Sequence, residues 1–451
     1  MGKAMRSEVS RSSHAHWTQG TSRPDPVALL EEQSSGRVPQ LEPIRYGRMS
    51  ASPFAFFRVA AYVMASDLAN SPQTGIRVQL CGDAHLSNFG GFASPERDLV
   101  FDLNDFDETL PGPWEWDVKR LAASISVAAR DRGIGLARRR EIVQGAVAEY
   151  RNAMHRFAGM KTLDVWYARL DETELSDELR QLKPRQARDL EKQAVKARSK
   201  DNARAFAKLA NYVNGNARIV PDPPLIVPIE GLLSGVQAKQ LKKALRSLVE
   251  AYQASLSGDL RHLVDRYQYA DAAHKVVGVG SVGTRDWVVL LLGRDSDDPL
   301  FLQAKEAKRS VLDAFAGKSE FDNQAQRVVE GQRLMQAASD IFLGWLRTTD
   351  IDGESRDFYL RQLWDWKSSA DIAKMRPSDI GAYVRLCAWT LARAHARSGD
   401  AIGIAAYMGS ADVFDRAIAA FAEAYADQNE RDYETLLEAI DSGRVEAKTG
   451  L

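Results

Sequence analysis

Cysteines and long apolar runs are scarce in this chain, and each scarcity excludes a class of protein. Cys81 and Cys387 are the only cysteines among 451 residues, too few for a disulfide framework, which favours a reducing compartment. The most apolar N-terminal run, residues 54–65, is interrupted by Arg58 and is too short to span a bilayer. The polar N-terminal segment lacks the apolar core of a signal peptide. The sequence therefore predicts a cytoplasmic protein without a membrane partner.

A surplus of charge is absent as well. The 60 Lys and Arg residues oppose 61 Asp and Glu residues, and the net charge of −1 gives no general attraction to nucleic acid. The hydrophobic content of 45% suffices for one large core or two lobes and excludes a disordered chain. We therefore expect a folded protein without a nucleic-acid partner.

Two acidic motifs stand out against this neutral background. Asp83 and Asn88 lie five residues apart in the segment 82–88, and a second acidic cluster occupies residues 102–107. Phosphoryl transfer on magnesium needs an Asp that accepts a hydroxyl proton, an Asn on the metal and a further Asp on the same metal. These roles fit Asp83 and Asn88, with Asp102 and Asp105 competing for the third.

The order Gly-Asp-x-His-x-x-Asn, then Asp-Phe-Asp at residues 105–107, resembles the catalytic and metal loops of the protein-kinase-like superfamily. His85 favours its aminoglycoside phosphotransferase and choline kinase branch, which tends to carry His two residues after the catalytic Asp. The resemblance implies that Asp105 rather than Asp102 holds the metal and that Asp117 braces the catalytic loop. A structural hydrogen-bonding role for His85 is an equal alternative. The segment before Asp83 departs from the superfamily, which usually has His or Arg there.

A glycine loop is missing before Asp83 and appears instead at residues 277–284. Glycines at such points let backbone N–H groups approach phosphate oxygens, although this short pattern alone also fits an ordinary hairpin turn. A strand at 300–304 then leads to Lys305, and a helix at 326–335 carries Glu330. The resemblance implies that Lys305 grips the ATP phosphates and that Glu330 is its ion-pair partner. The expected nucleotide contacts are Gly278, Gly280, Ser281, Gly283, Lys305, Gln362 and Leu363, the last two at the end of a strand that leads to a hinge.

This inverted motif order predicts a circular permutation. The helix at 383–395 resembles the one that normally runs into the catalytic loop, yet no such loop follows it. The new termini would lie between that helix and the strand at 77–80, which compact domains tolerate when the original ends are close. We therefore expect an α+β, two-lobed, kinase-like fold with a mainly helical large lobe and a small antiparallel nucleotide lobe.

The expected organisation has four parts. These are a flexible tail over 1–40 with a short helix near 26–33, a mainly helical catalytic lobe over 41–270, a nucleotide-binding lobe over 271–370, and C-terminal helices over 371–451. The basic stretch 183–208 fits a solvated helix better than a surface for an acidic substrate, because acidic residues are interleaved.

A second resemblance covers roughly residues 40 to 435, including the segments 45–49, 52–54 and 425–428. It is to an uncharacterised bacterial family of unknown function, and it implies no substrate. The motifs thus carry the functional hypothesis, which is an ATP- and Mg²⁺-dependent phosphotransferase acting on a hydroxyl acceptor, with Asp83, His85, Lys305 and Glu330 as catalytic residues and Asn88 and Asp105 as metal ligands.

Three alternatives stay open. One is an inactive nucleotide-binding regulator, and another is a nucleotidyl transferase on the same fold. The third, a metallophosphoesterase, is suggested by Asp83 and His85 but needs several more ligands. The six other histidines stand in no ligand-like cluster.

Overall fold

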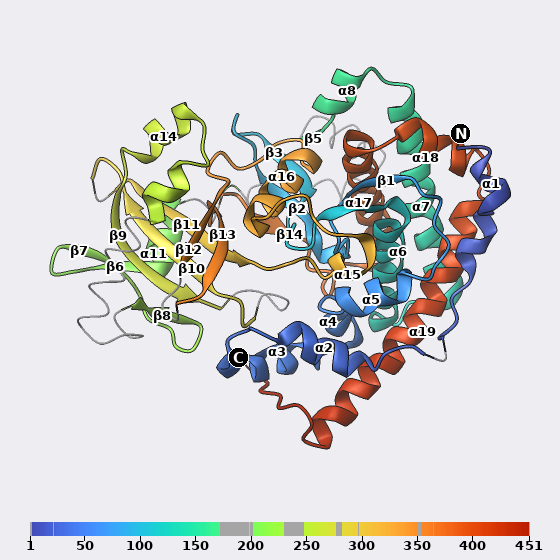
Figure 1. The fold of residues 1–451 in the computed structure, drawn as a ribbon, viewed down its shortest axis with the longest axis horizontal. Helices are drawn as coiled ribbons and strands as arrows, with labels where there is room; N and C mark the ends of the chain where they lie inside the picture. The colour runs from blue at the N-terminus through green and yellow to red at the C-terminus, as the bar shows by residue number, and fades with distance from the viewer. Residues whose placement is uncertain are drawn as a thin grey trace.

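The computed structural model describes residues 2–20, 22–171, 198, 202–229, 248–276, 282–295, 297–349, 353–363 and 365–450. It confirms an α+β protein, and every strand pair in its sheets is antiparallel. A large sheet occupies one side of the molecule and most of the long helices occupy the other (Figure 1). Among the described helices, none has both the length and the apolarity that crossing a membrane requires.

The large sheet has the strand order β12-β13-β11-β10-β9-β8. Its strands are β8 (Ile226–Pro228), β9 (Gln268–Lys275), β10 (Asp286–Leu292), β11 (Pro299–Ala307), β12 (Gly344–Thr349) and β13 (Ser355–Gln362). Strand β11 is central and is followed in the chain by α15 (Asp313–Ala316) and α16 (Gln324–Met335). Lys305 therefore lies on an interior strand, paired on one side with Asp286 and on the other with Tyr359.

Both faces of this sheet are buried, which explains why β10 is almost continuously apolar. Val289 and Leu291 face one cluster with Tyr252, whereas Leu290 belongs to a second cluster with Phe301. That second cluster includes α11 (Asn202–Leu209) and the hairpin of β6 (Ala210–Val213) and β7 (Asn216–Ile219). The β-rich part thus begins near residue 202, earlier than the expected boundary at 271. A short helix, α14 (Gly258–Val264), precedes β9.

The helical side is built on a helix with almost no solvent-facing residues, α6 (Trp114–Asp131). Around it pack α7 (Leu136–Ala158), α17 (Pro377–Ser398) and α19 (Val413–Asp441), with α18 (Ala401–Met408) against α7. Polar groups on α6 find partners within the core: Glu115 accepts hydrogen bonds from Thr74, and the Lys119 ammonium donates to Ser71. Two shorter helices precede β1 in the chain, α4 (Pro53–Phe57) and α5 (Ala61–Leu68).

The two acidic motifs lie between short strands on the helical side. Strand β1 (Arg77–Leu80) pairs with β4 (Leu110–Pro113), and β2 (Phe89–Ala93) pairs with β3 (Leu99–Leu103). A short helix, η3 (Leu86–Asn88), precedes β2, while β5 (Leu170–Asp171) and β14 (Ser368–Ser369) extend the second sheet; α8 (Thr162–Tyr167) lies before β5. The register sets Phe89 opposite Leu103. Asn88 therefore meets the segment that begins at Asn104.

The N-terminal segment, expected to be a flexible tail, is instead held against the helical core. It contains α1 (Met5–Glu8), η1 (Arg11–Ala15), the expected helix as α2 (Pro26–Ser34), η2 (Pro39–Leu41) and then α3 (Glu42–Met49). Arg23 forms buried ion pairs with Asp67 and Asp432, at 2.7 and 2.6 Å. Local composition suggested a tail because the partners of Arg23 are 44 and 409 positions away in the chain.

We predict a measurable contribution of this segment to stability through the cap of α2. The Asp25 carboxylate accepts hydrogen bonds from the backbone N–H of Val27 (2.7 Å) and Ala28 (3.3 Å). Asp25→Ala should lower the free energy of unfolding by about 1 kcal/mol, as loss of an N-cap does. Asp25→Asn is the control, because Asn caps equally well. Denaturant titrations with equal stability for Asp25→Ala and wild type would show that the segment does not contribute.

Candidate active site

A cleft brings together segments that lie far apart in the sequence. Its lining residues are Gln33, Arg37, Arg58, Val59, Ala61, Asp83, Asp105, Asp107, Glu108, Thr284, Glu306, Lys308 and Arg309. They come from the α2 to α5 region, from both acidic loops, from Thr284 at the end of the glycine loop and from the end of β11. The cleft thus joins the sheet side of the molecule to the helical side.

The loop that carries Asp83 is braced by Asp117, as the resemblance implied. The backbone N–H groups of Cys81 and Gly82 donate to the Asp117 carboxylate at 2.8 and 3.1 Å, and His395 Nε2 lies 3.3 Å from it. Gly82 has φ +81°, and a Cβ there would lie 2.3 Å from the Glu108 carbonyl oxygen. Only glycine fits this position. The geometry of the loop therefore requires a glycine directly before Asp83.

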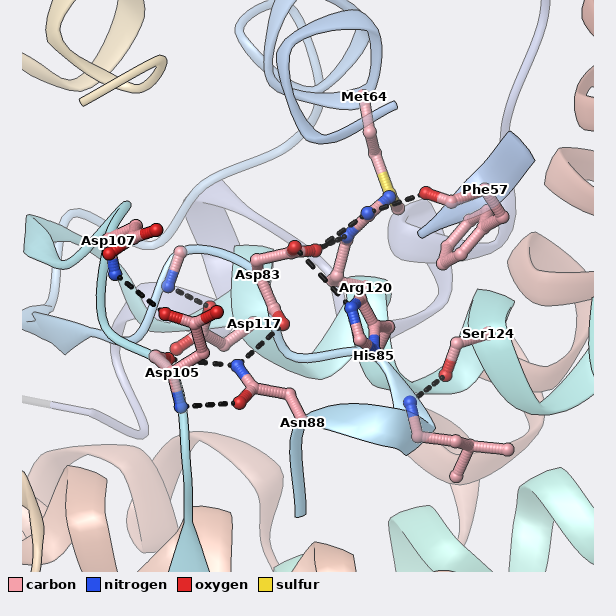
Figure 2. A network of polar contacts seen from close by, with 12 residues as sticks. Phe57, Met64, Asp83, His85, Asn88, Asp105, Asp107, Asp117, Arg120 and Ser124 are labelled. Atoms are coloured by element: carbon pink, nitrogen blue, oxygen red, sulfur yellow. Dashed lines mark hydrogen bonds and ion pairs between the residues drawn. The ribbon is translucent and has the colours of Figure 1, made fainter. Parts of the chain in front are cut away.

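Arg120 fixes one oxygen of the Asp83 carboxylate. Its Nε and Nη2 both donate to Asp83 Oδ1, at 2.9 and 2.7 Å. Nη2 also donates to the Phe57 carbonyl at 2.7 Å, and the guanidinium lies over the Phe57 ring, 4.1 Å from its centroid (Figure 2). Sequence reasoning missed Arg120. Its position one helical turn after Asp117, on the same face of α6, could have indicated it.

His85 faces the other oxygen of the same carboxylate. Its Nε2 lies 3.5 Å from Asp83 Oδ2, too far for a good hydrogen bond. Burial lowers the pKa of His85 to about 4, against the opposing effect of the Asp83 charge, so the imidazole is neutral at pH 7. Its Nδ1 is buried and has no hydrogen-bond partner in the described part of the chain. His85 is thus placed beside the carboxylate as a neutral ring.

Asn88 ties the two acidic loops together. Its Nδ2 donates to the carbonyl oxygens of Asp83 (3.0 Å) and Asp105 (2.9 Å), and its Oδ1 accepts from the Asp105 N–H at 2.7 Å (Figure 2). The Asp105 side chain is 47% exposed and lines the cleft. Asn88 and Asp105 therefore adjoin Asp83, as the sequence hypothesis requires.

Asp102, the competing metal ligand, does not line this cleft. Its carboxylate is buried, lies 2.5 Å from Arg393 Nη2 and accepts the N–H of Ala337 at 2.9 Å. These partners occupy it in a structural ion pair. The preference for Asp105 over Asp102 agrees with this geometry.

Lys305 reaches the acidic cluster from the sheet. Its Nζ forms an ion pair with Asp107 and lies 3.7 Å from Asp105 Oδ2, while the Tyr359 hydroxyl donates to Asp107 Oδ1 at 2.7 Å. Burial by itself would lower the pKa of Lys305, but the charges of Asp105 and Asp107 raise it well above its ordinary value. The ammonium is therefore charged at neutral pH.

Positive charge acts on Asp105 in turn. Burial would raise the pKa of its carboxyl, but Lys305, Arg361 and Lys367 outweigh burial and lower the pKa to about 2. A carboxylate that stays ionised under physiological conditions is suited to hold a cation.

The expected ion pair between Lys305 and Glu330 does not form: Lys305 pairs with Asp107 instead. Glu330 lies 3.7 Å from Arg333 Nη1, and its side chain is 37% exposed. The residue of α16 that faces the site is Arg327, which donates to the carbonyl oxygens of Thr109 (2.6 Å) and Asp107 (2.8 Å). The rotation of α16 about its axis, set by packing, turns Arg327 inward and Glu330 outward.

Only part of the expected nucleotide contacts can be located. Gly278, Gly280 and Ser281 lie outside the described residues. Gly283 is described: it has φ +88°, and its carbonyl accepts the N–H of Val38 at 2.8 Å. The segment at 37–38 thus holds the end of the glycine loop, since Arg37 Nη1 also donates to the Val282 carbonyl at 2.7 Å.

Gln362 and Leu363 lie at the end of β13 and have structural partners. The Gln362 N–H donates to Asp340 at 2.5 Å, and the Leu363 N–H donates to the Phe301 carbonyl at 2.9 Å. Their expected contact with a nucleotide stays a prediction.

Comparison with known proteins gives one family. A family model described as "Uncharacterized protein conserved in bacteria (DUF2252)" matches residues 37–439. No curated protein and no solved structure matches the chain. The match spans most of the sequence, including both acidic loops, Lys305 and the helices of the core. The chain therefore belongs to this bacterial family, as the second resemblance indicated.

Proposed function

We propose that this protein is an ATP- and magnesium-dependent phosphotransferase with a circularly permuted, kinase-like arrangement, acting on a hydroxyl acceptor. The observation that carries the proposal is the meeting of Asp83, Asn88, Asp105 and Lys305. These residues come from three separate segments, and Lys305 Nζ lies 3.7 Å from Asp105 Oδ2. A base, metal ligands and a phosphate-binding cation are the parts that phosphoryl transfer needs.

The order of the strands supports a nucleotide-binding role for the sheet. Protein kinases place a glycine-rich loop over the phosphates, a lysine on the third strand and then a helix. Here β9 and β10 flank the glycine loop, β11 carries Lys305 as the third strand, and α16 follows. Helix α16 departs from that scheme in one respect, because Arg327 rather than Glu330 faces the acidic loops.

Contacts at the end of α17 support the permutation. The Gln79 N–H of β1 donates to Ser398 Oγ at 3.2 Å. A Cβ on Gly399 would lie 2.5 Å from Val78 Cγ1, so the end of α17 touches β1. A chain running from α17 directly into β1 and the Asp83 loop would restore the usual kinase order. Close original ends are what circular permutation requires.

The proposed division of work follows from the contacts. Asp83, anchored through Oδ1 by Arg120, would orient an acceptor hydroxyl and take its proton at Oδ2. Lys305 would neutralise phosphate oxygens. Asn88 and Asp105 would supply oxygen ligands of the kind that Mg²⁺ prefers, and the described residues hold no preformed cluster of three or more His, Cys, Asp or Glu for a metal. Such a sparse set suits an ion shared with phosphates, where magnesium offsets negative charge.

Calorimetric titration with ATP, with and without magnesium, tests this proposal. Wild type should bind ATP in a magnesium-dependent manner, and Lys305→Gln should weaken binding at least about tenfold, as loss of a charge-assisted hydrogen bond does. Lys374→Gln is the control, because that exposed lysine pairs with Asp371 at 2.8 Å, outside the cleft. Wild type that does not bind ATP, or folded Lys305→Gln that binds it normally, would overturn the proposal.

One observation favours a second candidate, a nucleotide-binding regulator. Asp83 already has a charged partner in Arg120, so it needs no acceptor to be satisfied. Nucleotidyl transfer on the same fold would use the same residues with a reversed ATP. Turnover measurements, given in the Discussion, separate these candidates.

A further inference from the structure

The cleft contains more positive charge than the proposed phosphoryl transfer uses. Four of the five lining carboxylates lie near a cation: Asp83 pairs with Arg120, Asp107 pairs with Lys305, Asp105 lies 3.7 Å from Lys305 Nζ, and Glu306 lies 3.5 Å from Arg356. The side chains of the lining arginines Arg58 and Arg309 form no hydrogen bond or ion pair with the described residues. The cleft thus has unpaired cations beside paired acids.

Of the two arginines, Arg58 gives the stronger evidence for a bound anion, because it is the more buried. It lies at the turn between α4 and α5, is half-buried, and its Nε is buried without a hydrogen-bond acceptor in the described part of the chain. Burial lowers the pKa of Arg58, and the negative charge of Asp83 opposes this effect. Burying a guanidinium without a partner costs free energy. A bound anion would remove that cost.

Glu108, the fifth lining carboxylate, has no cationic partner within salt-bridge distance among the described residues and carries less negative charge at neutral pH than an ordinary carboxylate. Its side chain accepts the N–H of Val311 at 2.7 Å, and burial raises the pKa of its carboxyl to about 7. An acceptor bearing several amines would therefore meet two guanidinium groups without partners, whereas the carboxylates of Asp83 and Asp107 are already paired with cations.

We propose that the acceptor is a phosphorylated hydroxyl compound, whose phosphate is bound by Arg58 and Arg309 while its hydroxyl faces Asp83. This inference rests on the proposed function and names its substrate class. Guanidinium groups match the geometry of phosphate oxygens, and two of them balance the two charges of a phosphate monoester. Arg58 lies close enough to Asp83 for their charges to interact, which places the phosphate on the acceptor side of the cleft.

The test uses the full chain saturated with a non-hydrolysable ATP analogue and magnesium, titrated with inorganic phosphate in a calorimeter. Phosphate should bind to this complex, and Arg58→Gln and Arg309→Gln should each raise its Kd at least about tenfold, the loss expected for a charge-assisted hydrogen bond. Arg138→Gln should leave the Kd unchanged, because Arg138 is exposed on α7 and pairs with Glu141 at 2.8 Å. Arg309 is exposed, so its variant keeps the test valid if Arg58→Gln fails to fold.

The outcomes separate the two proposals. If the analogue binds and phosphate does not, the acceptor inference is wrong and the proposed function stands. If phosphate binds only without the analogue, the arginines serve the nucleotide and the inference is overturned. Acetate binding as tightly as phosphate would replace the phosphate by a carboxylate and overturn it as well. If the analogue itself does not bind, the proposed function fails and the inference fails with it.

Discussion

Asp83→Asn is expected to lower turnover by about 10²–10⁴-fold, the usual contribution of a positioned base, while the affinity for magnesium and ATP stays nearly unchanged. The reason is geometric: Arg120 holds Oδ1, which leaves Oδ2, 3.5 Å from His85 Nε2, as the atom that would meet an acceptor. Asparagine keeps an oxygen for Arg120 but cannot take a proton. A loss confined to turnover is the sign of an interaction made in the transition state.

Slow ATP hydrolysis can serve as the first assay, because water can replace an unknown acceptor. Asp98→Asn is the control, since this half-exposed aspartate pairs with Arg169 at 2.8 Å and does not line the cleft. Suppose wild type binds ATP but shows no hydrolysis, autophosphorylation or nucleotidyl transfer above the Asp83→Asn level. The regulator would then replace the phosphotransferase, and nucleotidyl transfer alone would select the transferase alternative.

Asp105→Ala is expected to abolish the magnesium dependence of ATP binding. The ATP affinity of the variant with magnesium should fall to the wild-type value measured with a chelator, because the ionised carboxylate of the metal site is gone. Its pKa of about 2 means that this carboxylate is charged throughout the neutral range, so the effect should not vary between pH 6 and 8. Calorimetry in both buffers measures it directly.

Asp102→Ala is the matched comparison, because it removes the other candidate carboxylate. Its expected effect is on stability: Arg393 would keep a buried charge without its partner, which costs about 3–5 kcal/mol. The folded fraction should retain magnesium-dependent ATP binding. The reverse ranking, with magnesium dependence lost only in Asp102→Ala, would move the metal site to Asp102.

The sequence alone was sufficient where neighbours along the chain decide the structure. Strand β1 occupies the expected residues 77–80, and the strand that ends near Lys305 and the helix at 326–335 both form. The proximity of the Asp83 and Asp105 loops could be predicted from the sequence because their motif has fixed spacings. Such features depend on local periodicity and on short segments whose geometry is the same in many folds.

Tertiary packing decided the partners of the charged groups. Whether Glu330 or Arg327 faces the acidic loops depends on the rotation of α16 about its own axis, which the packing of the helix sets. The anchoring of the N-terminal segment depends on Arg23 meeting Asp432, which is 409 positions away. Arg120 and Arg58 also gain their significance only when α6 and the turn after α4 meet Asp83 in space. The sequence thus determined the elements and the acidic motifs, whereas the fold determined which charges are paired. The physical reason is that ion pairs are selected by distance in space rather than by spacing in the chain.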